Sequence, residues 1–175
     1  MDPKLIHEFN VQIKEELYSA YLYLAMSAKS RQLGFDGIAN WFFIQFQEEL
    51  DHAKGLFKYM QTREADADLL AIPEPDKNLG TEIADLFKLT LEHEKFITGR
   101  INLLYKMAME VGDFASVEFL RWYVSEQVEE EANANKYLDK ATRIKAMPDA
   151  LYILDDELAL RIYTPIDPAN LGAAA

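Results

Sequence analysis

The chain has 175 residues, of which 50% are hydrophobic, 30 are Asp or Glu and 18 are Lys or Arg, giving a formal net charge of −12. This size and composition indicate one soluble domain with a substantial core. The acidic excess argues against binding to nucleic acid or to an anionic membrane, because both need a basic face. The absence of cysteine excludes disulfides, Cys-ligated zinc and iron–sulfur clusters, so any metal site must use oxygen and imidazole ligands.

Secretion and membrane insertion are not expected. The amino-terminal residues are charged where a secretion signal needs an apolar core. No run approaches the roughly 18 apolar residues that a membrane span requires. We therefore expect a cytoplasmic protein without nucleic-acid or membrane partners.

The few glycines and prolines leave long uninterrupted segments of helical character. In each segment apolar residues recur at steps of three and four, as on one face of a helix. The predicted long helices cover residues 3–33, 37–63, 82–110 and 114–145. Residues favoured at helix N-caps stand at their starts, namely Asp2, Asp36, Thr81 and Asp113.

A proline-containing segment, residues 64–80, separates the second helix from the third. It lacks a sustained period and is predicted to be a long crossover, which lets the third helix start at the same end of the bundle as the second. A short apolar helix is predicted at 149–160 and a flexible tail at 164–175. The sequence thus predicts an all-α domain over residues 1–163, a four-helix bundle with a fifth helix appended.

Candidate metal ligands lie on the apolar side of every long helix. On the second helix Glu49 and His52 are one turn apart and in line with Trp41. A Glu-x-x-His pair alone is common on solvated helix faces, but buried acids are costly unless they are paired or bound to a metal. The other helices supply further oxygen donors on their core-facing sides: Glu16, Glu94, Gln127 and Glu130.

Several carboxylates with one imidazole favour a hard or borderline ion such as iron or manganese. Two ions that share bridging carboxylates would neutralise about four acids inside the bundle, which explains why such acids converge. Because two adjacent Fe(II) ions can pass two electrons to one dioxygen, the predicted chemistry is oxidative.

Four stretches of the sequence resemble non-haem ferritins of the bacterial and archaeal type, within the ferritin-like di-iron four-helix bundles. They read NVQIKEELYS, QEELDH, EHEKF and WYVSEQVEEE and cover residues 10–19, 47–52, 92–96 and 122–131. The resemblance implies a ferritin-like fold, with the long crossover after the second helix and a short fifth helix at the carboxyl end.

The resemblance also implies residue roles at a ferroxidase centre. Glu16, Glu49 and His52 would hold the first iron, with Glu49 bridging to the second. Glu94 and Gln127 would serve the second iron and its oxygen chemistry, and we include Glu130 among the metal ligands.

Further roles follow from the same resemblance. Tyr23 matches an aromatic residue that hydrogen-bonds beside the centre and donates an electron, so Tyr23, Glu49 and Gln127 are the expected catalytic residues. The residues implied for a third iron site near the inner surface are Glu48, Glu126, Glu129 and Glu130.

The function implied by the resemblance is iron storage. Each subunit would oxidise Fe(II) with dioxygen or peroxide and deposit ferric mineral inside a hollow homo-oligomer, expected to contain twenty-four subunits in octahedral symmetry. Two to three irons per subunit are expected at the ferroxidase region. Haem is not expected, because no Met is clearly placed as its ligand at a dimer interface.

Other functions remain open from the residues alone. A di-iron oxidase or peroxidase of the rubrerythrin kind would retain its iron, but it would carry a second Glu-x-x-His on the fourth helix, where this chain has Gln127 and Glu130. A purely structural bundle would have to bury several unpaired acids. A small DNA-protecting shell protein would need a basic surface.

Overall fold

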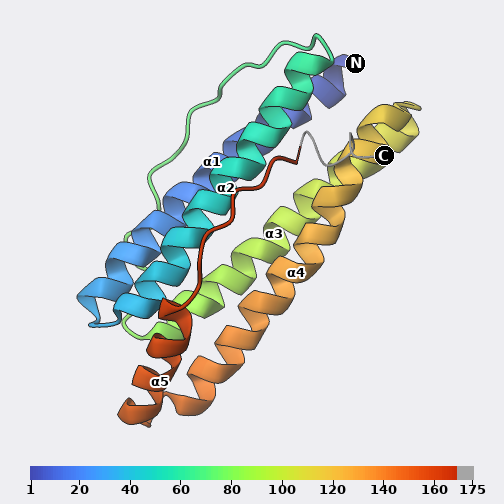
Figure 1. The fold of residues 1–175 in the computed structure, drawn as a ribbon. Coiled ribbons are helices and arrows are strands. Elements are labelled where there is room, and N and C mark those ends of the chain that lie inside the picture. Colours follow the sequence, from blue (N-terminus) through green and yellow to red (C-terminus); the bar gives the residue numbers. More distant parts are fainter. Residues whose placement is uncertain (169–175) are drawn as a thin grey trace.

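A computed structural model describes residues 1–168 and contains five helices and no strand within them (Figure 1). The long helices are α1 (Pro3–Gln32), α2 (Asp36–Thr62), α3 (Ile83–Glu110) and α4 (Phe114–Ile144), and the short one is α5 (Pro148–Ala159). Every helix end lies within one residue of the range predicted from periodicity. The prediction of an all-α four-helix bundle with a short fifth helix is confirmed.

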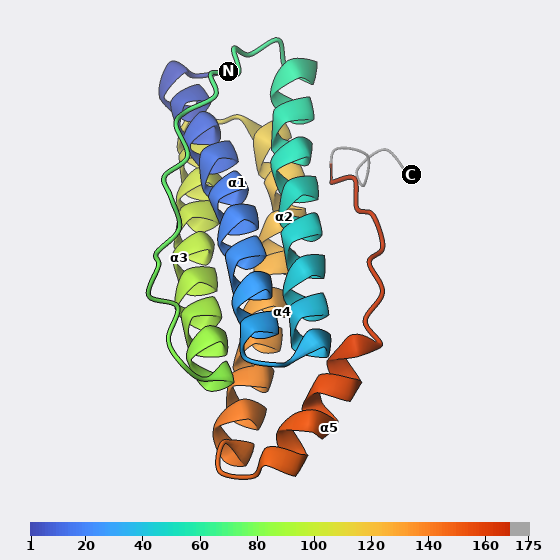
Figure 2. The same cartoon turned by 90° about the vertical axis from the view of Figure 1, so that its left-hand side faces the viewer.

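The four long helices form two antiparallel pairs, α1 with α2 and α3 with α4 (Figure 1). The crossover from residue 63 to residue 82 connects the first pair to the second and runs the length of the bundle (Figure 2). The Asn10 side chain on α1 fixes the start of this crossover, because it donates to the Asp66 carbonyl at 3.1 Å and accepts from the Asp68 amide at 2.9 Å. The predicted long crossover is therefore present.

The core consists of two apolar clusters with a polar layer between them. One cluster surrounds Tyr23, Phe42 and Phe87, and the other surrounds Phe9 and Leu56. Along each long helix one set of buried polar side chains falls between the positions of the two clusters. The buried acids and their neighbours in this layer are Glu16, Ser19, Gln45, Glu49, His52, Thr90, Glu94, Gln127 and Glu130.

Two of the four predicted N-caps are correct. The Asp2 carboxylate accepts from the Lys4 amide at 2.8 Å, and the Asp113 carboxylate accepts from the Ser116 amide at 3.2 Å. Each therefore satisfies an amide that the first turn of its helix leaves free.

The other two predicted N-caps, Asp36 and Thr81, are wrong by one residue. Asp36 is the first residue of α2 and pairs with Arg31 at 2.9 Å, so Phe35 takes the cap position. At α3 the cap is Glu82, because the Asp85 carboxylate accepts from the amides of both residues that precede the helix, at 2.9 and 3.0 Å.

Helix α5 packs against the first turn of α2. The Ile38 amide, which lacks a local partner, donates to the Asp155 carboxylate of α5 at 2.7 Å. The backbones approach so closely that a Cβ on Gly37 would lie 1.9 Å from the Asp155 carbonyl oxygen. Leu154 and Leu158 of α5 are buried, whereas Tyr152 and Ile153 on its other face are exposed, as is Leu160 at its C-cap.

After α5, residues 161–168 run back along α2, and we call this segment the C-terminal strap (Figure 2). The sequence predicted a flexible tail from residue 164. Residues 164–168 are instead held against α2, since the Ile166 amide donates to Asp51 at 2.9 Å and Lys58 pairs with Asp167 at 2.8 Å. The remainder of the predicted tail, residues 169–175, lies outside the described residues.

None of the helices within residues 1–168 is long and apolar enough to cross a lipid bilayer.

Replacing Asp155 by Ala should loosen the contact between α5 and α2, because the Ile38 amide would lose its acceptor. The expected cost is about 0.5–2 kcal/mol, as for removal of a helix cap. Faster hydrogen exchange in the first turn of α2 and in α5 would report the change. Asp156→Ala alters the exposed neighbouring residue and serves as the control. Equal exchange in the two variants would contradict this account of the contact.

Candidate metal centre

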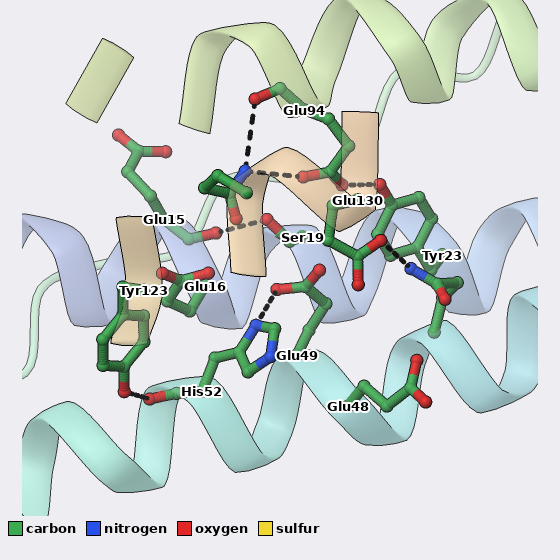
Figure 3. Close-up of polar contacts among 12 residues, drawn as sticks. Glu15, Glu16, Ser19, Tyr23, Glu48, Glu49, His52, Glu94, Tyr123 and Glu130 are labelled. Carbon is green, nitrogen blue, oxygen red and sulfur yellow. Dashed lines mark hydrogen bonds and ion pairs between the residues drawn. The ribbon is translucent and has the colours of Figure 1, made fainter. Parts of the chain in front are cut away.

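Three potential metal ligands converge in the polar layer: Glu16 from α1 and Glu49 and His52 from α2 (Figure 3). One ligand atom from each lies within 4.8 Å of the others. All three side chains are buried. The helical spacing of three residues places Glu49 and His52 one turn apart on the same face, and the α1–α2 pairing brings Glu16 to them.

The hydrogen bonds of this group leave ligand atoms free. His52 Nδ1 lies 3.3 Å from Glu49 Oε2, and Gln12 Nε2 donates to Glu16 Oε1 at 2.9 Å. Within the described residues, His52 Nε2 and Glu16 Oε2 are buried and have no hydrogen-bond partner. Buried polar atoms are nearly always satisfied, so such orphaned atoms indicate a missing ligand. Oxygen and imidazole donors of this kind fit iron.

The backbone next to His52 is also fixed. Tyr123 on α4 donates its hydroxyl to the His52 carbonyl at 2.8 Å, and the Trp122 and Tyr123 rings contact the imidazole edge-on. These contacts restrict rotation of the ring, so the imidazole is held in place before any ion binds.

Glu94 on α3 forms a second part of the site, with partners on α1 and α4. Gln127 Nε2 donates to Glu94 Oε2 at 3.1 Å, and the buried Tyr23 hydroxyl donates to Glu94 Oε1. Figure 3 shows Tyr23 and Glu94 on the side of the site away from His52. Glu94 and Gln127 are buried as expected, but they are bonded to each other and are not part of the three-residue group.

The remaining predicted ligands extend from the centre toward the surface. Glu130 is buried on α4, and its Oε2 accepts from Gln45 Nε2 at 2.9 Å. Glu48 pairs with Arg161 at 2.6 Å. Of the other two acids proposed for a third site, Glu126 is half-buried and Glu129 is exposed.

Burial raises the pKa of the acids in the polar layer. The pKa values of Glu16 and Glu49 lie well above the usual carboxyl range, because burial disfavours the charged form and neighbouring carboxyls add to the effect. Burial also raises the pKa of Glu94, although hydrogen bonds from Tyr23 and Gln127 oppose the shift. For Glu130, burial and the nearby Glu94 raise the pKa to about 8.

The partners of these acids are mostly uncharged amides and a phenol, contributed by Gln12, Gln45, Gln127 and Tyr23. They orient the carboxyl groups without neutralising them. A cation that bound among these oxygens would supply the missing positive charge and displace protons. The arrangement therefore suits a metal site that is protonated when empty.

Several functional side chains were not assigned a role from the sequence. Gln12 and Gln45 stand on apolar faces, and a buried amide in such a position is a signal that could have pointed to them. Arg161 follows the last helix and lies in no periodic pattern, so its pairing with Glu48 had no signal in the sequence.

Comparison with known proteins gave consistent matches over most of the chain. The Ferritin family model, described as a ferritin-like domain, matches residues 6–144. A bacterial non-heme ferritin of Campylobacter jejuni is 36% identical over 155 residues, which cover 89% of this chain and 92% of the relative. One from Staphylococcus aureus is 32% identical over 163 residues, which cover 93% and 98%.

Solved structures of archaeal proteins are also similar. A closed form of the Archaeoglobus fulgidus ferritin, engineered by mutagenesis, has a TM-score of 0.91 and 41% identity, covering 94% of this chain and 99% of that one. The open-pore ferritin from the same archaeon has a TM-score of 0.90 and 41% identity, covering 93% and 99%.

Binding of a divalent cation at pH 7 should release protons, because Glu130 and its buried neighbours hold protons at that pH. Since the carboxyl pKa values are raised, cation affinity should increase with pH, including through the pKa of Glu130 at about 8. Titration calorimetry with Zn(II) in two buffers of different ionisation enthalpy measures the number of protons released.

Glu130→Gln tests this assignment, because an amide has no proton to lose. The variant should release about one proton fewer than the wild type if Glu130 is a ligand. A binding enthalpy that is the same in both buffers would contradict the prediction.

Proposed function

Since the chain belongs to the ferritin family of iron-storage proteins, we propose that each subunit oxidises Fe(II) in its polar layer before storing the iron. The observation that carries this proposal is the convergence of Glu16, Glu49 and His52, with buried ligand atoms that have no partner within residues 1–168. Iron is the substrate of this site and is passed onward to the store.

The two irons are proposed to bind in unequal environments. The first would be held by Glu16, Glu49 and His52, and Glu49 would bridge to the second. Glu94, Gln127 and Glu130 would hold the second iron without an imidazole. Fewer strong ligands mean weaker binding, which suits an ion that must leave after oxidation.

The proposed reaction is a two-electron reduction of dioxygen. Each Fe(II) loses one electron, and dioxygen accepts both electrons with two protons to give hydrogen peroxide. The carboxyl groups with raised pKa values hold protons next to this site before iron binds. The pKa of Tyr23 is also raised, chiefly by burial, so its phenol keeps the proton that it donates to Glu94. This position supports the proposal that Tyr23 assists the oxidation by holding Glu94 beside the second iron.

Oxidised iron is proposed to leave through a third site formed by Glu48, Glu126, Glu129 and Glu130. The half-buried and exposed positions of Glu126 and Glu129 favour a path from the polar layer to the surface. Each subunit would then hold two to three irons in transit.

Storage requires an assembly of many copies of this chain, and we propose a cage of twenty-four subunits with octahedral symmetry. The outward face of α5 supports association, since it exposes Tyr152 and Ile153 close to the exposed Leu160 at the C-cap of the helix. A di-iron oxidase that keeps its metal is less well supported, because Gln127 and Glu130 replace the second Glu-x-x-His that a symmetric centre would use.

Loss of a ligand at the first iron should slow oxidation. Metal-free protein loaded with Fe(II) without oxygen, then mixed with air, should oxidise iron at least about tenfold more slowly in Glu49→Ala and His52→Ala than in the wild type. The initial absorbance change of Fe(III) measures the rate. Glu92→Gln, which changes an exposed acid on α3, should oxidise iron like the wild type. Equal rates in all four proteins would refute the site assignment.

Storage and assembly can be tested together. Size-exclusion chromatography and electron microscopy should show a hollow particle with the mass of twenty-four chains of 20.1 kDa. After repeated additions of Fe(II) in air, the particle should retain far more than three irons per chain. A monomer or dimer that holds about two irons per chain would instead support the di-iron oxidase.

A further inference from the structure

The C-terminal strap follows one stripe of α2 along its length (Figure 2). The α2 residues that it contacts recur at steps of three and four: Trp41, Gln45, Glu48, Asp51, Gly55 and Lys58. This spacing is that of one helix face, so the strap covers a single side of α2. That side includes Glu48, one of the acids proposed for the third iron site.

Arg161, the first residue of the strap, is held from three directions. Its Nη1 donates to Gln45 Oε1 at 2.5 Å, and its Nη2 donates to Glu48 Oε2 at 2.6 Å. The guanidinium also stacks over the Trp41 ring at 5.2 Å from the ring centre. The Arg161 side chain is 26% exposed and that of Glu48 is 14% exposed, so the ion pair is largely shielded from water.

Through Gln45 the same arginine reaches the metal centre. Gln45 accepts from Arg161 through its amide oxygen and donates through its amide nitrogen to Glu130 Oε2 at 2.9 Å. Arg161 is therefore connected to two acids proposed as iron ligands, directly to Glu48 and through one amide to Glu130. Figure 3 shows Glu48 beside the group of Glu16, Glu49 and His52 rather than within it.

Arg161 also lies on the path to these acids from outside. An open polar hollow between α2, α4 and α5 is lined by Trp41, Tyr137 and Arg161, and by Glu129 of the proposed third site. An ion that moves between this hollow and Glu48 meets the guanidinium of Arg161.

We propose that Arg161 competes with the third iron for Glu48. Arg161 binds Glu48 when no cation is present, and a cation binds there only by displacing Arg161. This inference rests on the proposed function, because it takes Glu48, Glu126, Glu129 and Glu130 as cation ligands. A divalent ion and a guanidinium at the same carboxylate repel each other, and this repulsion is strong where water is largely excluded. Docking of Arg161 on Glu48 therefore weakens binding of the third cation, and binding of the cation weakens docking of Arg161 by the same factor.

The consequence is a third site that binds iron weakly, because each binding event must displace Arg161 from Glu48. Iron that leaves the polar layer would then pass through the site instead of remaining in it. Without the positive charge of Arg161, the four acids would hold a cation more tightly, and iron would remain bound in the site.

The test measures cation binding directly, without relying on oxidation. The assembled full-length protein is titrated with Zn(II), which is not oxidised, and the affinity of each class of site is determined by calorimetry. Arg161→Gln removes the charge but keeps a hydrogen-bonding side chain. We expect it to tighten the weakest class of site by about tenfold, within the usual range of coupling between two ligands, and to leave the tighter classes unchanged.

Two control variants separate charge from docking of the strap. Arg161→Lys keeps the positive charge and should bind Zn(II) at the weakest site like the wild type. Tyr163→Phe removes the hydrogen bond from the strap to Asp51, 2.5 Å long in the wild type, without touching Glu48, and should also behave like the wild type. If Arg161→Lys behaves like Arg161→Gln, or if Tyr163→Phe tightens the site equally, the proposal is overturned.

Failure of this inference can be told apart from failure of the proposed function. If the wild type binds Zn(II) at tight sites that His52→Ala lacks, the metal centre stands. Unchanged or weaker binding at the third site in Arg161→Gln then overturns the role of Arg161 alone. Only two cations in both proteins overturns the third site as well, while the metal centre stands. If His52→Ala binds Zn(II) like the wild type, the metal centre itself is wrong.

Discussion

Carboxyl groups from all four long helices share the middle of the bundle, where water is excluded and ionised acids are costly. Glu16, Glu49, Glu94 and Glu130 are all buried in this layer, and their raised pKa values express that cost. Apolar clusters on both sides close off the layer from the ends of the bundle. The rest of the protein provides the stability that allows these acids to remain buried until a cation binds.

The choice of partners for these acids explains how the layer stays both ordered and ready for metal. An arginine or lysine would neutralise a carboxylate and compete with iron for it. The amides of Gln12 and Gln127 each donate one hydrogen bond to a carboxyl group and bring no charge. The acids are thus oriented while their affinity for a cation is preserved, in contrast to Glu48 near the surface, which is paired with Arg161.

The sequence was most informative where structure depends on local spacing. Helical periodicity located every helix end to within one residue, and the i, i+3 spacing of Glu49 and His52 identified two of the three side chains that converge in the candidate metal centre. The cap at Asp36 was wrong because Asp155, far along the chain, accepts from the Ile38 amide. The cap at Thr81 was wrong because Asp85, in the first turn of α3, accepts from the two preceding amides. The position of the strap depends on long-range contacts with α2, which no local pattern records.

Gln45 shows why one side chain can join the metal layer to the strap. Its amide donates to Glu130 and accepts from Arg161 at the same time. A carboxylate at this position could accept from Arg161 but would add a negative charge beside Glu130, and a lysine could donate but not accept. An amide alone among side chains of this length links an acid on one side to a guanidinium on the other. The polar layer and the end of the chain are therefore connected through a neutral group, so that the charge of Arg161 stays at the surface end of the path and the inner acids remain available to iron.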